Sequence, residues 1–137
     1  MDEMKATWTG GLRFELHSAT GHDTVTDAPV DVGGTDSAPT PMELVMLGLL
    51  GCTGLDVASM LHKMKQPLEH FEVRATHERA EKHPRIFTRI HLIYELRGDL
   101  SPKKVQRAVD LSESTYCSVS AMLRETTEIT NEVRINP

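Results

Sequence analysis

Two cysteines, Cys52 and Cys117, are the side chains in this 137-residue sequence best suited to covalent chemistry. A cysteine thiolate is a strong nucleophile, and two thiols can form and reopen a disulfide. Cys52 lies in a glycine-rich apolar segment that leaves its sulfur uncrowded, and Cys117 directly precedes a helical pattern whose N-terminus favours a thiolate. The alternative is that both are inert core residues, because free cysteine is among the most buried residue types.

Neither cysteine has a histidine at the spacing of a zinc motif, although the chain holds seven histidines. Two cysteines alone do not complete the usual zinc site. We therefore expect no metal site and no cofactor. The N-terminal MDEMKATW lacks the basic and apolar parts of a signal peptide, so we expect a cytoplasmic protein, where a cysteine pair is more often redox-active than structural.

Composition excludes several classes of function. The net charge is -5 and no basic run occurs, which disfavours nucleic acid as a partner. Glu43 and Asp56 bracket the most apolar segment, which is then too short for a membrane span. A chain of this length is expected to form one domain over residues 1–137.

The segment from Thr40 to Lys65 predicts a long helix that organises the fold. Thr40, Pro41 and Glu43 have the order of an N-cap, a first-turn proline and a capping box. The centre of the segment is apolar or glycine on all sides, which predicts burial all round. Its glycines recur every third residue and would offer a smooth face to another backbone, at Gly48, Gly51 and Gly54.

The rest of the chain alternates strand patterns with helix patterns. Gly10 and Gly11 predict a tight hairpin between the first two strands, and Ser101 predicts the cap of a helix that runs to about Ser114. The order of hairpins and helices favours an α+β domain with antiparallel strands around the long helix. The expected strands are 4–9, 12–17, 22–26, 68–80, 86–98 and 127–135, and a second short helix is expected over 118–126.

Three pieces surround the two cysteines: MELVMLGLLGC at Cys52, LDVASMLHK after it, and DLSESTYCSVSAML around Cys117. In these pieces the sequence resembles the family of osmotically inducible protein C and the organic hydroperoxide resistance proteins (the OsmC/Ohr family). The resemblance covers most of the chain from about Lys5 onward and is greatest to a small OsmC-like branch of the family.

The resemblance implies a thiol-dependent peroxidase acting on organic hydroperoxides. Cys52 matches the peroxidatic position, Cys117 the resolving position, and Glu43 a third catalytic position. A dithiol such as dihydrolipoamide, or a small thiol, would then reduce the disulfide. The resemblance further implies an intertwined homodimer with two active sites at the subunit interface.

Two features depart from this pattern. Family peroxidases hold the thiolate with an arginine before the long helix, but residues 14–42 contain none. Arg13 is the candidate nearest in sequence to that segment. Arg85 lies in an expected turn and is interpreted more simply as a solvent-exposed charge. Nine helical residues rotate through about 900°, so Glu43 and Cys52 would face opposite ways, about 13 Å apart along a straight helix. Glu43 could then act from the other subunit, or serve only in the capping box.

The alternative function is therefore an OsmC-like stress or ligand-binding protein with little or no turnover. It would keep the fold and bind an apolar, acyl-like ligand near the helix interface. The arginine that is missing from the expected segment favours this alternative, whereas the cysteine pair favours the enzyme.

Overall fold

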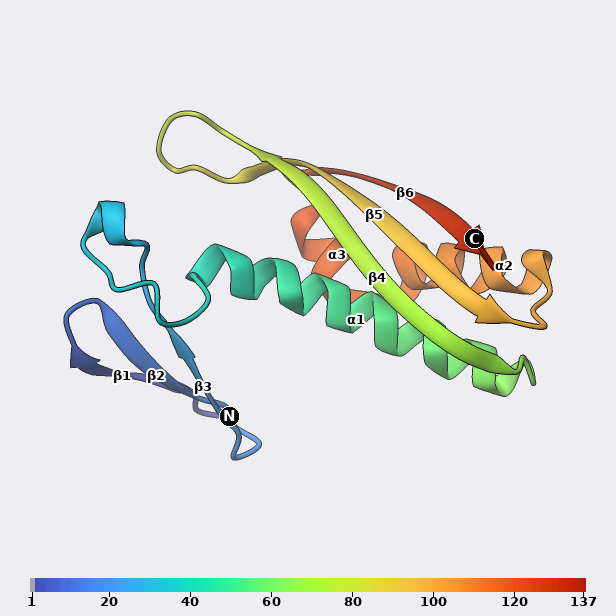
Figure 1. The fold of residues 1–137 in the computed structure, drawn as a ribbon, viewed down its shortest axis with the longest axis horizontal. Helices are drawn as coiled ribbons and strands as arrows, with labels where there is room; N and C mark the ends of the chain where they lie inside the picture. Colours follow the sequence, from blue (N-terminus) through green and yellow to red (C-terminus); the bar gives the residue numbers. More distant parts are fainter. Residues whose placement is uncertain (1) are drawn as a thin grey trace. The chain divides into compact units, whose positions relative to one another are not determined.

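The computed structural model describes residues 2–137 and has the expected mixed α+β architecture (Figure 1). The chain forms two compact units, one up to Met46 and one from Leu47 to Pro137. The long helix α1 (Pro41–Lys63) begins in the first unit and continues in the second. The single domain expected over residues 1–137 stays a prediction.

The first unit contains an antiparallel sheet of three strands in the order β1-β2-β3. The expected turn at Gly10 and Gly11 lies one residue later, because Gly10 still pairs with Arg13 after an irregularity that follows Trp8. The turn therefore consists of Gly11 and Leu12, and both glycines have positive φ angles that suit them to this bend. The strands are β1 (Lys5–Gly10), β2 (Arg13–His17) and β3 (Asp23–Thr26), followed by the short helix η1 (Val30–Val32).

The loop that leads from β3 to α1 is ordered around one carboxylate. Asp27 accepts hydrogen bonds from the hydroxyls of Thr35 and Ser37, both at 2.7 Å, and from the Ala28 and Ser37 amides. These hydrogen bonds, led by that of Thr35, hold the pKa of Asp27 far below its usual range. A loop rich in turn residues thereby gains a fixed shape that delivers the chain to the cap of α1.

The capping box at the start of α1 is confirmed. The Thr40 amide donates to Glu43 Oε1 at 3.0 Å, and the Glu43 amide donates to Thr40 Oγ1 at 3.2 Å. Two amide groups at this end of the helix are satisfied in this way.

Within a single chain the centre of α1 is not buried on every side, contrary to the prediction. Leu49, Val57 and Leu61 are fully buried, but Leu47 and Leu55 are 52% and 75% exposed. The helix therefore has one face in the core and one apolar face outside it. By length and composition α1 would also suit a membrane span, a test that core helices of water-soluble proteins pass as well.

The second unit is a three-stranded sheet with helices against one face (Figure 1). The strands are β4 (Leu68–Arg79), β5 (Phe87–Gly98) and β6 (Glu128–Ile135), in the order β4-β5-β6. The first pair is antiparallel as expected, but β6 runs parallel to β5. The helical segment between β5 and β6 is long enough to return the chain to the end at which β5 began, which a parallel pair requires. Alternate residues of β5 fill the core under the helices, namely Ile90, Leu92, Tyr94 and Leu96.

The connection between β5 and β6 has a different form from the one expected. Helix α2 (Pro102–Leu111) is capped by Ser101, whose side chain accepts a hydrogen bond from the Lys104 amide at 3.3 Å. Beyond Leu111 the backbone widens into a π-helical turn, η2 (Ser112–Tyr116), and α3 (Ser118–Leu123) follows. The regular helix thus ends before Ser114.

Candidate active site

The structure brings the two cysteines together with a carboxylate. The sulfurs of Cys52 and Cys117 and a carboxylate oxygen of Asp56 all lie within 4.8 Å of one another. Cys52 and Asp56 are one helical turn apart on the same side of α1, and Cys117 comes from the N-cap of α3. Both cysteines are free thiols; Cys117 is buried and Cys52 is half-buried.

The π-helical turn fixes the position of Cys117. The Cys117 amide donates to the Ser112 carbonyl at 2.7 Å, five residues back in the chain, which is the hydrogen bond that defines a π turn. The Cys117 sulfur accepts a hydrogen bond from the Ser120 amide at 3.4 Å. Backbone groups on both sides of Cys117 therefore hold its side chain toward α1.

A chain of buried hydroxyl groups ends on Asp56. The Ser112 hydroxyl donates to Asp56 Oδ2 at 2.9 Å and lies 2.8 Å from Thr53 Oγ1, which lies 2.7 Å from the Tyr94 hydroxyl. A hydroxyl has one proton, so Thr53 must donate to Ser112 and Tyr94 must donate to Thr53. Every hydroxyl in this hydrogen-bonded series therefore donates in the direction of Asp56. The series holds the Asp56 carboxylate beside the two sulfurs.

Burial controls the electrostatics around this cluster. Removal from water raises the pKa of the Cys117 thiol, an effect that the hydrogen bonds from Ser120 oppose and the neighbouring Cys52 reinforces. Burial likewise raises the pKa of Tyr94, which stays a neutral donor. Burial also raises the pKa of Glu113, although Arg124 lies 3.8 Å from it.

Comparison with known proteins identifies the family. The sequence model of the family described as "OsmC-like protein" matches residues 34–132, which include both cysteines and Asp56. The chain belongs to the OsmC-like family. It is 40% identical to protein YhfA of Escherichia coli K12 over 134 residues, an alignment that covers 97% of each chain.

Solved structures agree with this assignment. A protein of Aquifex aeolicus described as hypothetical has 27% identity and a TM-score of 0.82, over 100% of this chain and 98% of that one. An organic hydroperoxide resistance protein of Elizabethkingia anophelis has 19% identity and a TM-score of 0.74, over 99% and 98% of the two chains. At that identity the second likeness shows a shared fold only.

The other residues singled out in the sequence have contacts of their own in this OsmC-like chain. Glu43 is in the first turn of α1, where its carboxylate completes the capping box, and its catalytic role stays a prediction. Arg13 donates to Ser37 Oγ at 2.6 Å, within the first unit. Arg85 is exposed and donates to the Ala80 carbonyl at 3.4 Å, as expected of a solvated turn residue.

Sequence reasoning missed Asp56 and Ser112. From the sequence, Asp56 was interpreted only as the charged residue that ends the apolar segment. Its spacing of four residues from Cys52 was available as a signal, because residues four apart share a helix face. The signal for Ser112 was weaker, since only the π turn brings it to α1.

A cavity of about 510 Å³ adjoins this OsmC-like site at Asp56. Methionine side chains supply apolar walls, and Lys63 and Arg107 supply positive charge. Tyr116, at the end of the π turn, is 60% exposed beside it. A small ligand in this cavity could therefore contact Asp56, whose carboxylate lies within 4.8 Å of the two sulfurs. The cavity is lined by Asp56, Ser59, Met60, Lys63, Met64, Arg107, Leu111 and Tyr116.

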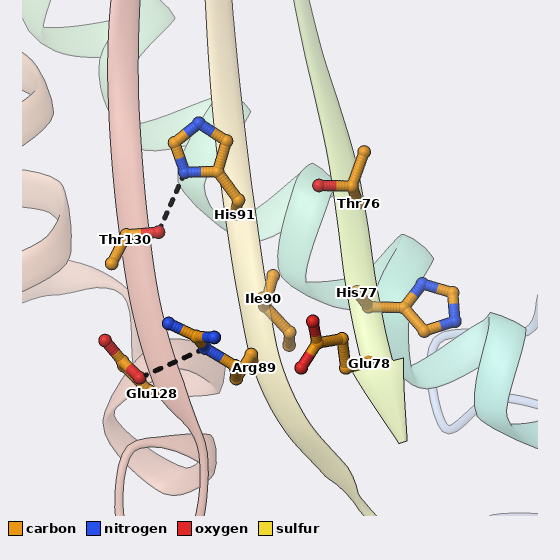
Figure 2. Close-up of a pocket in the computed structure, with 8 residues that line it drawn as sticks. All are labelled: Thr76, His77, Glu78, Arg89, Ile90, His91, Glu128 and Thr130. Atoms are coloured by element: carbon orange, nitrogen blue, oxygen red, sulfur yellow. Dashed lines mark hydrogen bonds and ion pairs between the residues drawn. The ribbon is translucent and has the colours of Figure 1, made fainter.

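A second cavity, of about 320 Å³, lies along β4, β5 and β6 (Figure 2). Its polar side chains pair with one another: Arg89 Nε lies 3.3 Å from Glu128 Oε2, and His91 Nδ1 lies 2.8 Å from Thr130 Oγ1. Its lining contains neither Asp56 nor a cysteine. A solvated sheet face accounts for these contacts, so we place the candidate site at the cysteines.

Proposed function

We propose that this chain is a thiol-dependent peroxidase that reduces organic hydroperoxides in the cytoplasm. The observation that supports this most is the approach of the Cys52 and Cys117 sulfurs to within 4.8 Å. A disulfide needs a sulfur separation of about 2.05 Å, so a small movement would join them. Membership of the OsmC-like family, and the hydroperoxide resistance protein with the same fold, are consistent with this chemistry.

In the first step the Cys52 thiolate attacks the distal oxygen of the hydroperoxide. The O–O bond breaks, the alkoxide takes a proton and leaves as an alcohol, and the sulfur becomes a sulfenic acid. Cys52 suits this role better than Cys117 because it is half-buried, whereas Cys117 is buried. Burial also keeps Cys117 protonated, as its raised pKa indicates.

In the second step the Cys117 sulfur attacks the sulfenic sulfur of Cys52. An S–S bond forms, and the hydroxyl leaves as water with the proton of the Cys117 thiol. A dithiol such as dihydrolipoamide, or two small thiols, then gives two electrons and two protons to restore both cysteines. The sulfenic acid is thus intercepted before more peroxide reaches it.

A homodimer is part of this proposal. Helix α1 exposes an apolar stripe of Leu47 and Leu55, with Gly48 and Gly51 between them. A Cβ atom added at either glycine would meet nothing within 4 Å among residues 2–137. Packing within one chain therefore gives no reason for these glycines, and close approach of a second α1 does.

A ligand-binding stress protein is the second candidate, and the cavity beside Asp56 is the observation that favours it. Residues 14–42 also contain no arginine, the residue with which the resemblance implies that family peroxidases hold the thiolate. The cavity beside Asp56 could hold an apolar ligand near thiols that react slowly. The two candidates differ in what one equivalent of peroxide does to the cysteines.

Intact-mass spectrometry after brief treatment with one equivalent of cumene hydroperoxide tests the proposal. The wild type should lose about two mass units and both free thiols, because a disulfide forms. The Cys117→Ser variant should gain about 16 mass units at Cys52, and further oxygen as peroxide is raised. Cys52→Ser should stay unmodified.

A chelator belongs in every sample, so that bound metal does not mask the thiols. The test requires the far-ultraviolet circular dichroism of each variant to match the wild type. A folded wild type that keeps two free thiols after this treatment would refute the peroxidase and favour the binding protein.

A further inference from the structure

We propose that Cys52, Asp56 and Cys117 form a binding site for a thiophilic divalent cation, with zinc as the natural occupant. Three atoms that can bind such an ion, two sulfurs and one carboxylate oxygen, lie within 4.8 Å of one another. This site does not depend on peroxidase activity, because it needs only the reduced thiols and the carboxylate.

The geometry suits zinc after a small contraction. Zinc binds thiolate sulfur at about 2.3 Å and carboxylate oxygen at about 2.0 to 2.2 Å in a tetrahedron, which puts neighbouring ligand atoms about 3.6 to 3.8 Å apart. Cys52 and Asp56 share one helix face, and neither cysteine is tied up in a disulfide. Two thiolates and one carboxylate carry three negative charges, which a divalent cation offsets and which would otherwise repel.

Groups outside the ligand set already hold the ligands in place. Ser112 donates to Oδ2 of Asp56 at 2.9 Å, which leaves Oδ1 for an ion. The Ser120 amide donates to the Cys117 sulfur at 3.4 Å, and this bond also supports a thiolate. Such partners orient metal ligands and raise metal affinity. The ordered hydroxyl chain from Tyr94 through Thr53 ends on a metal ligand in this arrangement.

The fourth position of the tetrahedron is available to water or to an exogenous ligand. The cavity of about 510 Å³ adjoins the cluster at Asp56 and gives an ion a route from solvent. An open position of this kind is typical of exchangeable or catalytic zinc. Neither cysteine has a histidine at zinc-motif spacing, and a carboxylate four residues after Cys52 supplies the third ligand instead.

Binding proceeds without oxidation or reduction. Each thiol loses its proton to solvent, and each sulfur forms a bond to zinc with its own electron pair. Two protons are therefore released for each ion bound. Bound zinc would also keep both sulfurs from reacting with peroxide.

Cobalt titration followed by zinc displacement tests the site on the full chain, reduced, stripped with chelator and kept without oxygen. The wild type should bind one Co²⁺ per chain with an intense thiolate-to-cobalt charge-transfer band, and Zn²⁺ should remove that band. Asp56→Asn should weaken zinc binding by about tenfold or more. Asp110→Asn is the matched control, because Asp110 is an exposed carboxylate on α2 that accepts a hydrogen bond from Gln106 at 2.9 Å. The zinc affinity of this variant should equal that of the wild type.

A measurement on the wild type alone guards against variants that fold poorly. Zinc should slow the alkylation of both cysteines, and chelator should restore it. Cobalt binding without the charge-transfer band would point to the cluster of His70, Glu72 and Glu95 and overturn the proposal. Wild-type affinity in a folded Asp56→Asn protein would overturn it as well.

Discussion

Cys117 and Ser112 are joined by a backbone hydrogen bond of 2.7 Å that spans five residues. This bond closes the π turn and directs the Cys117 sulfur and the Ser112 hydroxyl to the same part of α1. A regular α-helix through these residues would rotate one of the two side chains away. The position of the second thiol thus depends on one irregular turn.

Replacing Ser112 with alanine should destabilise the protein by about 1 to 3 kcal/mol. The change removes the donor to Asp56 and the acceptor for Thr53 in a fully buried position. Urea unfolding followed by circular dichroism measures the effect. Ser114→Ala is the control, since Ser114 is exposed in the same turn and should change stability by less than about 0.5 kcal/mol. Equal stability of the two variants would show that the hydroxyl chain contributes little.

Most of the fold could be predicted from the sequence because its signals are local. The capping box at Thr40, the Ser101 cap, the prolines and the alternating strands mark the ends of elements within a few residues. Strand direction is not local, and the parallel pair of β5 and β6 was missed for this reason. The exposed face of α1 was also missed, because an apolar pattern does not distinguish a core from an interface.

The site was predicted in part, for a similar reason. The two cysteines could be chosen by their chemistry, and the structure brings them within 4.8 Å. Asp56 escaped notice because a charge on a long helix usually reads as a solvated residue. The π turn has no sequence signature that we can name, so the placement of Ser112 required the structure.

Cys117 should titrate at a higher pH in the folded protein than in the unfolded chain. Burial is the main cause of its raised pKa, and it remains when Cys52 is replaced by serine. Because a raised pKa favours the neutral thiol, the folded state is stabilised below the ordinary cysteine pKa and loses that stabilisation as pH rises through the folded pKa.

Iodoacetamide alkylation of Cys52→Ser as a function of pH measures this shift. The midpoint in buffer should lie above the midpoint in urea, where the same cysteine is solvated. The midpoint is the quantity to compare, because burial also slows access of the reagent at every pH. Equal midpoints in buffer and in urea would contradict the desolvation of Cys117.

Replacing Leu55 with glutamate should convert a homodimer into monomers. Leu55 is 75% exposed in the single chain, and a charge there would have to be buried against the partner. Light scattering across a dilution series measures the change in mass. Val30→Glu is the control, because Val30 is 70% exposed in η1, outside the stripe on α1, and should leave the mass unchanged. A wild type that is already a folded monomer at low concentration would contradict the dimer.

Replacing Glu43 with glutamine separates the two roles of this residue. A glutamine oxygen can still accept from the Thr40 amide, so the capping box and the stability should survive within about 0.5 kcal/mol. Glu43→Ala removes the acceptor and should cost about 0.5 to 2 kcal/mol. If the carboxylate takes part in catalysis, as the resemblance implies, both variants should slow oxidation of Cys52 by about tenfold or more. Stopped-flow measurement with cumene hydroperoxide, alongside urea unfolding, gives both quantities. A glutamine variant with the wild-type rate would leave Glu43 a helix cap only, and the proton chemistry at Cys52 would then have to come from another group.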